Sequence, residues 1–306
     1  MNNFLTDDTE VEKVFSHHNN TFEINELMLV IPPYSEEYKN IFVPQRFEDT
    51  VASHVIAPYL EKNIFYKPPI YLAIMGEAGE GKTAQAIATC TQKGFYVIYV
   101  SASALSGSHE NEAREKLQRI YSYTLELRKK SLVAIVIDDF HKGIVNEDEN
   151  IKKTINTDVL IGYMMNIAEH NGAVHIPIIL TANDLSKIYA PLLRTGRADK
   201  FFWKPRLGEK KEVVYKILCS FMGERDENKF NRFFDQFCNE NIAFFAQLEN
   251  QWRKGLIKKT IHNISTFNEV NIQRINNFVN SSEKKLTYAQ LTNIANDYKA
   301  ERSENE

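Results

Sequence analysis

Residues 70–83 read IYLAIMGEAGEGKT, an apolar run that ends in a glycine-rich turn. The turn, Gly76–Thr83, matches the pattern G-x-x-x-x-G-K-[ST]. This pattern indicates a phosphate-binding loop only where a strand precedes it and a helix follows it. Here an apolar run precedes it, and a helical stretch, Thr83–Thr91, follows it. These residues therefore predict a buried strand, a phosphate-binding loop and a helix, in that order.

The glycine-rich turn also predicts what it binds. Its glycines let backbone N–H groups point at phosphate oxygens, and the following helix offers its positive end. Lys82 can reach between the β- and γ-phosphates, and the Thr83 hydroxyl is a hard oxygen ligand suited to Mg²⁺. The alternative is a glycine-rich turn with an incidental lysine. Such a turn would not require the complete G-x-x-x-x-G-K-[ST] spacing that is present here. We expect ATP and Mg²⁺ as ligands, and the expected nucleotide-binding residues are Gly76, Glu77, Ala78, Gly79, Glu80, Gly81, Lys82, Thr83 and Ala84.

Similar apolar runs recur along the chain, and helical stretches separate them. Nearly continuous apolar runs suit strands that are buried on both faces of a parallel sheet. The alternation therefore predicts an α/β fold of the P-loop NTPase type, with a parallel sheet and helices on both faces. The runs are Ile70–Met75, Phe95–Val100, Leu132–Ile137, Ile176–Leu180 and Phe201–Trp203, and the helical stretches are His109–Lys130 and Thr154–His170, with a further helix from Val51.

The strand-like runs stop near residue 204, and the rest of the chain reads as helices. One of these helices opens with a capping box at Thr287 and Gln290. We expect an extended N-terminal arm over residues 1–45 and an α/β ATPase domain over 46–206. A small α-helical lid domain over 207–300 and a charged tail over 301–306 complete the expected organisation.

Two carboxylates follow the run Leu132–Ile137. A carboxylate at the C-terminal end of a buried strand, next to a phosphate loop, can hold Mg²⁺, and its neighbour can orient or deprotonate the attacking water. We assign Asp138 to the metal and Asp139 to the water. The two roles could be exchanged, and a helix cap or turn is the alternative reading.

Three polar side chains farther along the chain complete the expected site. Asn183 follows the run Ile176–Leu180, where its amide can hold the attacking water or contact the γ-phosphate; an Asx turn is the alternative. Arg194 and Arg197 lie one helical turn apart and would supply positive charge to the γ-phosphate of a neighbouring subunit. The alternative for either arginine is a surface salt bridge.

The composition of the chain limits the classes of binding partner and the cellular location that we expect. The formal charge is −3, and no long run of Lys and Arg is present, which argues against nucleic acid. The three cysteines are far apart and form no metal-binding motif, as expected of reduced thiols. No apolar stretch is long enough to span a membrane, and the acidic N-terminus does not resemble a signal or transit peptide, so we expect a cytoplasmic protein.

These motifs resemble those of the AAA+ ATPase family and, within it, more closely those of Rubisco activase. The likeness runs from about Phe47 to about Tyr298. It is most specific from PIILTAND to KFFWKP, beyond the generic ATPase motifs. The other matching stretches are IAPYLEKN, the phosphate loop, SASALSGSHENEAREKLQRIY, IDDFHKG, TINTDVLIGYMMNIAEH, NIAFFAQLENQW and KLTYAQLTNIAND.

The resemblance implies a homo-oligomeric ring of six subunits that uses ATP to pull on a protein segment in its central pore. It implies Asn183 as the sensor, Arg194 and Arg197 as trans-acting fingers, and Rubisco or another large complex as the client. Residues 105–108 match the first pore loop, with an ordinary connecting loop as the alternative. Val145–Asn150 either line a second pore loop or form a solvated loop. The family's usual Asn-Asp is Asp138-Asp139 here.

One further departure concerns the helical lid. Where a lid arginine would normally touch the γ-phosphate, this chain has Glu249, with Arg253 one turn later as a substitute. The main function expected is ATP-driven remodelling of a protein client. The alternatives are an ATP-dependent loader or switch on nucleic acid, and a nucleotide-gated scaffold with little turnover.

Overall fold

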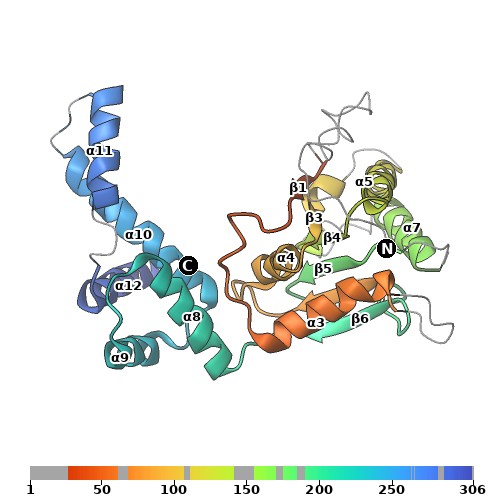
Figure 1. Ribbon diagram of the computed structural model, residues 1–306, viewed down its shortest axis with the longest axis horizontal. Helices are drawn as coiled ribbons and strands as arrows, with labels where there is room; N and C mark the ends of the chain where they lie inside the picture. The colour runs from red at the N-terminus through yellow and green to blue at the C-terminus, as the bar shows by residue number, and fades with distance from the viewer. Residues whose placement is uncertain are drawn as a thin grey trace. The chain divides into compact units, whose positions relative to one another are not determined.

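The computed structural model describes residues 27–60, 68–106, 111–140, 155–169, 175–184, 190–262, 264, 266–281 and 286–304. These residues form two compact units, which are taken separately below (Figure 1). The first unit comprises Met1–Glu77 and Lys82–Lys204. The second comprises Pro205–Glu306 together with the tip of the glycine-rich loop, Ala78–Gly81.

A six-stranded sheet forms the centre of the first unit, in the order β1-β3-β4-β5-β2-β6. Its strands from β2 to β6 pair in parallel, which confirms the predicted parallel α/β sheet. The strand bounds are β1 (Leu29–Ile31), β2 (Tyr71–Met75), β3 (Tyr96–Ser101), β4 (Val133–Asp138), β5 (Ile178–Ala182) and β6 (Ala198–Phe202).

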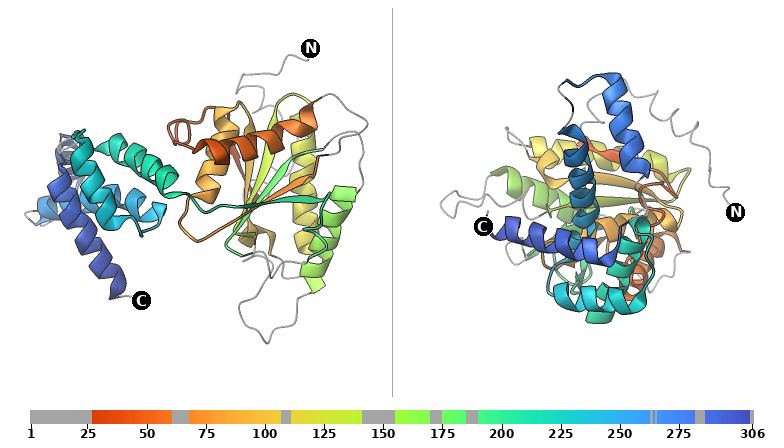
Figure 2. Two further views of the ribbon diagram at one scale, coloured as in Figure 1. Left: turned by 90° about the horizontal axis from the view of Figure 1, so that it is seen from below. Right: turned by 90° about the vertical axis from the view of Figure 1, so that its left-hand side faces the viewer.

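Helices cover both faces of this sheet, as predicted (Figure 2). Helices α3 (Gln45–Ile56) and α4 (Lys82–Gln92) bury their apolar side chains in the core on one face. Helices α5 (Glu112–Arg128) and α7 (Ile155–Glu169) do so on the other face. Two short 3₁₀ turns, η1 (Ala57–Tyr59) and η2 (Ala102–Leu105), follow α3 and β3.

Strand β2 shows why the decisive apolar run is continuous. Successive side chains of a strand point to opposite faces of the sheet. Leu72 and Ile74 accordingly lie in the core shared with α3 and α4, while Tyr71, Ala73 and Met75 lie in the core shared with α5 and α7. Because both faces are covered, every residue of the strand is buried.

Two elements differ from the sequence-based expectation. Residues 29–31, predicted as part of an extended arm, form edge strand β1, which pairs antiparallel with β3. The last strand begins at Ala198 instead of Phe201. Its first residues, Ala-Asp-Lys, are too polar to show an apolar run, because β6 is the other edge of the sheet and exposes most of its side chains.

The second unit consists of helices α8 (Leu207–Phe221), α9 (Glu227–Phe237), α10 (Ile242–Ile261), α11 (Glu269–Ser281) and α12 (Tyr288–Ser303). Aromatic side chains fill much of its core. Phe233 contacts Phe245 edge to face at 6.2 Å between ring centroids, and Phe237 stacks on Phe244 at 5.8 Å. Such pairs add to the free energy of burial. The helical character predicted for this region is confirmed.

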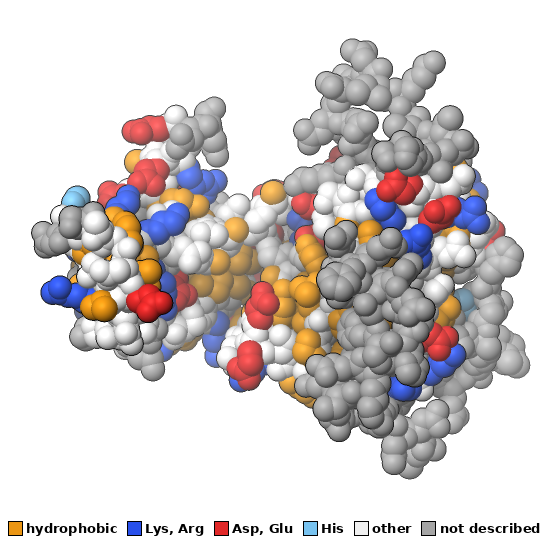
Figure 3. Space-filling model, turned by 90° about the horizontal axis from the view of Figure 1, so that it is seen from above, with side chains coloured by type: hydrophobic (Ala, Val, Ile, Leu, Met, Phe, Trp, Pro, Cys, Tyr) orange, Lys and Arg blue, Asp and Glu red, His pale blue; other side chains and the backbone are white. Residues whose placement is uncertain are grey.

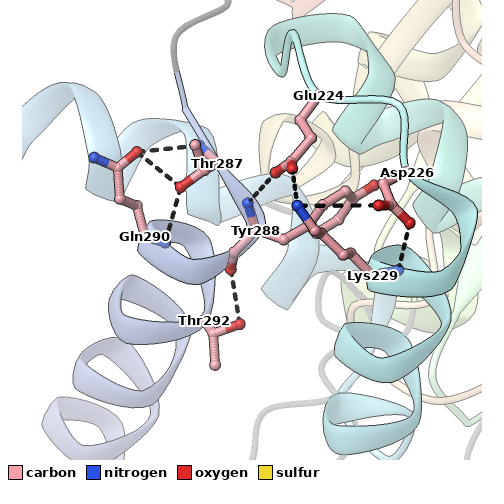
Figure 4. Close-up of polar contacts among 7 residues, drawn as sticks. All are labelled: Glu224, Asp226, Lys229, Thr287, Tyr288, Gln290 and Thr292. Atoms are coloured by element: carbon pink, nitrogen blue, oxygen red, sulfur yellow. Dashed lines mark hydrogen bonds and ion pairs between the residues drawn. The ribbon is translucent and has the colours of Figure 1, made fainter.

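Helix α12 is fixed at its first turn by polar contacts (Figure 4). Thr287 and Gln290 form the predicted capping box. The backbone N–H of Tyr288 donates to Glu224 at 2.8 Å, and the same carboxylate accepts from Lys229 at 2.5 Å. Glu224 therefore ties the segment between α8 and α9 to the start of α12.

Apolar side chains also reach the surface of the second unit (Figure 3). In α11 and the turn before it, Phe267, Val270, Ile272 and Phe278 are exposed. Across the described residues, no helix combines the length and the apolar character that a membrane-spanning segment needs. Within the same residues, no group of three or more His, Cys, Asp or Glu side chains is arranged to hold a metal ion.

Candidate functional site

The glycine-rich loop joins the end of β2 to the start of α4. A Cβ atom at Gly76 would lie 2.1 Å from the carbonyl oxygen of Trp203, so only glycine fits there. Gly79 and Gly81 have φ angles of +79° and +73°, the left-handed region that glycine adopts without a steric penalty. The loop conformation thus explains the glycines of the motif.

Lys82, the first residue of α4, turns its side chain back over this loop. Its ammonium group donates to the carbonyl oxygens of Gly76 and Glu77, both at 2.8 Å, and to Asn183 Oδ1 at 3.1 Å. The residue is buried, with 7% of its surface exposed. A buried charge needs such partners. The structure therefore brings Lys82 and Asn183 together across 101 positions of sequence.

Asp138, the last residue of β4, accepts hydrogen bonds from hydroxyl groups on three other elements. Its Oδ1 accepts from Thr83 on α4 at 2.5 Å and from Thr181 on β5 at 2.6 Å. Its Oδ2 accepts from the Tyr99 hydroxyl on β3 at 3.1 Å. Thr181 and Tyr99 were not predicted from the sequence, although Thr181 is a polar residue inside an otherwise apolar strand.

The donor set around Asp138 fits a magnesium ion carried by a nucleoside triphosphate. Mg²⁺ prefers hard oxygen ligands and takes one or two from the protein. Thr83 and Asp138 offer a hydroxyl and a carboxylate whose oxygens lie 2.5 Å apart, beside a loop whose backbone is shaped by glycine. These two residues would hold the ion.

Asp139 lies in the turn after β4, with a φ angle of +51° that is uncommon for a residue with a side chain. Its backbone N–H donates to the Thr181 hydroxyl at 3.3 Å, which helps to hold this conformation. The same threonine therefore contacts both aspartates. Residues kept in strained conformations concentrate at functional sites.

The electrostatics of this cluster keep Tyr99 protonated. Burial, followed by the negative charge of Asp138 and the hydrogen bond to it, raises the pKa of Tyr99 to about 12. A nearby tyrosine, Tyr38, also has a raised pKa, chiefly because of burial, with a smaller contribution from Asp138. The Tyr99 hydroxyl is therefore a hydrogen-bond donor throughout the physiological pH range.

Comparison with known proteins assigns the fold that carries this site. The sequence model of the "ATPase family associated with various cellular activities (AAA)" matches residues 72–206. Residues 72–206 of this chain therefore form an AAA region. The AAA region spans β2 to β6 and includes Lys82, Asp138 and Asn183.

Several ribulose bisphosphate carboxylase/oxygenase activases are similar to this chain. The protein from Anabaena sp. is 30% identical over 250 residues, which cover 77% of this chain and 59% of the relative. The protein from Nostoc sp. is 29% identical over 268 residues (83% and 64%), and that from Cucumis sativus is 26% identical over 279 residues (84% and 63%). The chain thus spans less than two thirds of these relatives. The predicted resemblance is confirmed.

The two arginines of the AAA region have different surroundings. Arg197 donates to the carbonyl oxygen of Pro191 at 2.6 Å and pairs with the Glu169 carboxylate at the end of α7. Arg194 is exposed. The hydrogen bonds of Arg197 lead to Pro191 and Glu169, and not to the cluster around Asp138. Within this chain Arg197 therefore forms a salt bridge, and its action on a neighbouring subunit stays a prediction.

The expected pore-loop residues are only partly described. Leu105 lies in η2 and is buried in the core, with 2% of its surface exposed, so it cannot grip a client as part of a surface loop. Ser106 is exposed. Gly107, Ser108 and the segment Val145–Asn150 lie outside the described residues.

The loop tip makes its contacts with the helices of the second unit. The Asn241 side chain caps α10 by accepting from Phe244 N–H at 2.9 Å, and its amide donates to the Ala78 carbonyl at 3.2 Å. Ala243 N–H donates to the Gly79 carbonyl at 2.8 Å. A Cβ atom at Gly79 would lie 2.3 Å from the Asn241 amide nitrogen. Asn241 was not predicted, and only its place before an apolar helix signals a cap.

Glu80 and Lys210 add an ion pair at 3.7 Å to the loop-tip contacts. Farther along α10, Glu249 and Arg253 pair with each other at 2.8 Å. Arg253, the candidate substitute for the usual lid arginine, is thus bonded within its own helix. Its role toward a nucleotide stays a prediction.

Proposed function

We propose that this chain is a Mg²⁺-dependent, cytoplasmic ATPase. It assembles into a ring of six copies and uses ATP hydrolysis to remodel a protein client. The α/β domain (46–206) hydrolyses ATP, and the helical domain (207–300) acts as its lid. The observation that carries the proposal is the bonded group of Lys82, Asn183, Thr83 and Asp138 beside the glycine-rich loop.

Each of these residues has a defined task in the proposed reaction. The N–H groups of Gly76–Ala84 bind the phosphates, and Lys82 exchanges its two carbonyl partners for phosphate oxygens. Asn183 then orients the attacking water with its amide. The bound magnesium ion supplies charge neutralisation for the phosphoryl group.

The two aspartates divide the remaining work. Asp138 accepts hydrogen bonds from three hydroxyl groups and keeps Thr83 in place. Asp139 accepts the proton of the water as it attacks. Comparing Asp138→Asn with Asp139→Asn tests the assignment: the first is expected to weaken metal-dependent binding, and the second to spare binding and abolish turnover. The reverse pattern would exchange the two roles.

Assembly is supported by Arg194, whose side chain is exposed and far in sequence from Lys82. A neighbouring copy could use it to stabilise charge on the γ-phosphate. The sequence similarity supports the proposed client, since the compared relatives are named as activases of ribulose bisphosphate carboxylase/oxygenase. At 26–30% identity, we propose as client either that enzyme or another large complex.

Mixing two inactive variants tests the proposal. Lys82→Ala and Arg194→Ala should each abolish ATP turnover while the protein stays folded. Mixed in equal amounts, they should recover part of the activity, because some shared sites then combine an intact lysine with an intact arginine. Lys93→Ala, on the surface after α4, is the control. No recovery in the mixture, with both variants folded and assembled, would contradict arginines acting in trans.

Capture experiments identify the client. An Asp139→Asn variant with ATP should hold a client that it cannot release, and the bound protein can be identified by mass spectrometry. Measured turnover of the unchanged chain separates this function from a nucleotide-gated scaffold. Turnover indistinguishable from that of Lys82→Ala would favour the scaffold.

A further inference from the structure

Both oxygen atoms of the Asp138 carboxylate accept hydrogen bonds. Both hydrogen bonds from threonines, Thr83 and Thr181, reach the same oxygen, Oδ1. The other oxygen, Oδ2, accepts from the Tyr99 hydroxyl at 3.1 Å. Without this third bond, the carboxylate would keep donors on one oxygen only, and Oδ2 would lose the donor that sets the plane of the group.

Strand pairing explains how Tyr99 reaches this carboxylate. Strands β3 and β4 run in parallel, with Ser101 opposite Asp138 and Tyr99 opposite Val136. Tyr99 thus starts two residues farther from the end of the sheet, and its long, rigid side chain spans that distance. A shorter hydroxyl residue at this position would not do so.

The ring of Tyr99 is fixed by packing. It lies partly buried against the core that α3 and α4 share with the sheet. Beside it in the sheet, β1 pairs with β3 and places Leu29 opposite Tyr99. A ring held in this way fixes the direction of its hydroxyl, so the bond to Asp138 costs little side-chain entropy when it forms.

We propose that Tyr99 is a positioning residue for Asp138, which fixes the carboxylate so that its Oδ1 stays directed at Thr83 and the two oxygens can serve one divalent cation. This inference rests on the proposed function, because it needs Asp138 to serve the metal of a bound nucleotide. Groups that orient a metal-binding carboxylate act through that carboxylate, and their loss typically lowers metal affinity about 10–100-fold.

The Tyr99→Phe substitution tests this role, because it removes one oxygen atom and keeps the packed ring. The measurement is the affinity of the full chain for a fluorescent, non-hydrolysable ATP analogue, titrated with Mg²⁺ and repeated in EDTA. We expect the half-saturating Mg²⁺ concentration to rise about 10-fold or more, in line with the loss of an orienting partner. The affinity in EDTA should not change, because the loop and Lys82 are intact.

Tyr71→Phe is the matched control. It removes a buried tyrosine hydroxyl that donates to the Met164 carbonyl at 2.8 Å, in the same sheet but at the start of β2. Its Mg²⁺ titration should match that of the unchanged chain. Melting temperatures of both variants establish that they are folded.

Three outcomes contradict the proposal in distinguishable ways. An unchanged Mg²⁺ requirement in Tyr99→Phe would mean that Thr83 and Thr181 suffice to orient Asp138. An equal loss of affinity with Mg²⁺ and in EDTA would mean that Tyr99 supports the loop and not the metal site. If the unchanged chain itself fails to bind the analogue, or binds it equally well without Mg²⁺, the proposed function fails, and this inference with it.

Discussion

Single residues decide how this protein tolerates buried charge and buried polarity. Lys82 is buried, and its ammonium group is compensated by two loop carbonyls and the Asn183 amide oxygen. Asp138 is compensated by three hydroxyl groups. Partners of this kind can be exchanged for phosphate oxygens or a cation without leaving either charge exposed to an apolar environment.

His54 is a buried residue that is only partly compensated. It lies in α3, and among the described residues its Nε2 atom has no hydrogen-bond partner. Burial, despite hydrogen bonds to the backbone of Ile178 and Ile70, lowers its pKa to about 4 from the ordinary value of 6.5. The unfolded chain therefore binds a proton at a higher pH than the folded chain does.

This difference predicts how stability depends on pH. The contribution of neutral His54 is fully present above about pH 6.5 and is lost as the pH falls through about 4, a total of roughly 3 kcal/mol. The free energy of unfolding in urea, compared at pH 4.5 and pH 7 for the unchanged chain and for His54→Leu, measures it. The loss on acidification should be smaller in the variant. Equal losses in both proteins would refute the prediction.

Among the helices and strands, the start of α12 offers a matched pair of threonines. Thr287 caps the helix, accepting from Gln290 N–H, whereas Thr292 lies inside it and donates to the Tyr288 carbonyl (Figure 4). Thr287→Ala should lower the free energy of unfolding by about 1 kcal/mol, because a cap is lost. Thr292→Ala should leave it unchanged or raise it slightly, because alanine favours a helix interior. Equal effects in urea unfolding would contradict this role of Thr287.

The two arginines in the segment before β6 are expected to respond differently to substitution by alanine. Arg197 is bonded to Pro191 and Glu169, so Arg197→Ala should lower both the melting temperature and ATP turnover. Arg194→Ala should abolish turnover without lowering the melting temperature, because its side chain is exposed. Differential scanning fluorimetry beside an ATPase assay checks both. A melting temperature that falls equally in both variants would mean that Arg194 is structural as well.

Across the whole molecule, strong local patterns predict the parts of the fold that the structure confirms. Ile70–Met75 is apolar because β2 is covered on both faces, and the glycines after it are required by the loop that they form. Thr287 and Gln290 predict a helix start by their spacing alone. Each of these features depends on neighbours in sequence.

The parts that sequence reasoning missed depend on contacts between distant segments. Edge strand β1 has only three residues, which is too short to show a period. Tyr99 and Thr181 reach the Asp138 carboxylate only because β3, β4 and β5 pair beside each other. The ion pair of Arg197 with Glu169 was likewise not predicted as a specific contact, because it forms only when α7 packs beside the segment before β6; the action of Arg197 on another copy stays a prediction.

Calorimetric titration of ATP in the presence of Mg²⁺ tests most directly the claim that the loop at Gly76–Thr83 is a nucleotide site. The unchanged chain should bind ATP at one site per copy, and Lys82→Ala should lose most of that affinity while its melting temperature stays close to that of the unchanged chain. Absence of ATP binding by the unchanged, folded chain, or equal binding by Lys82→Ala, would contradict the account.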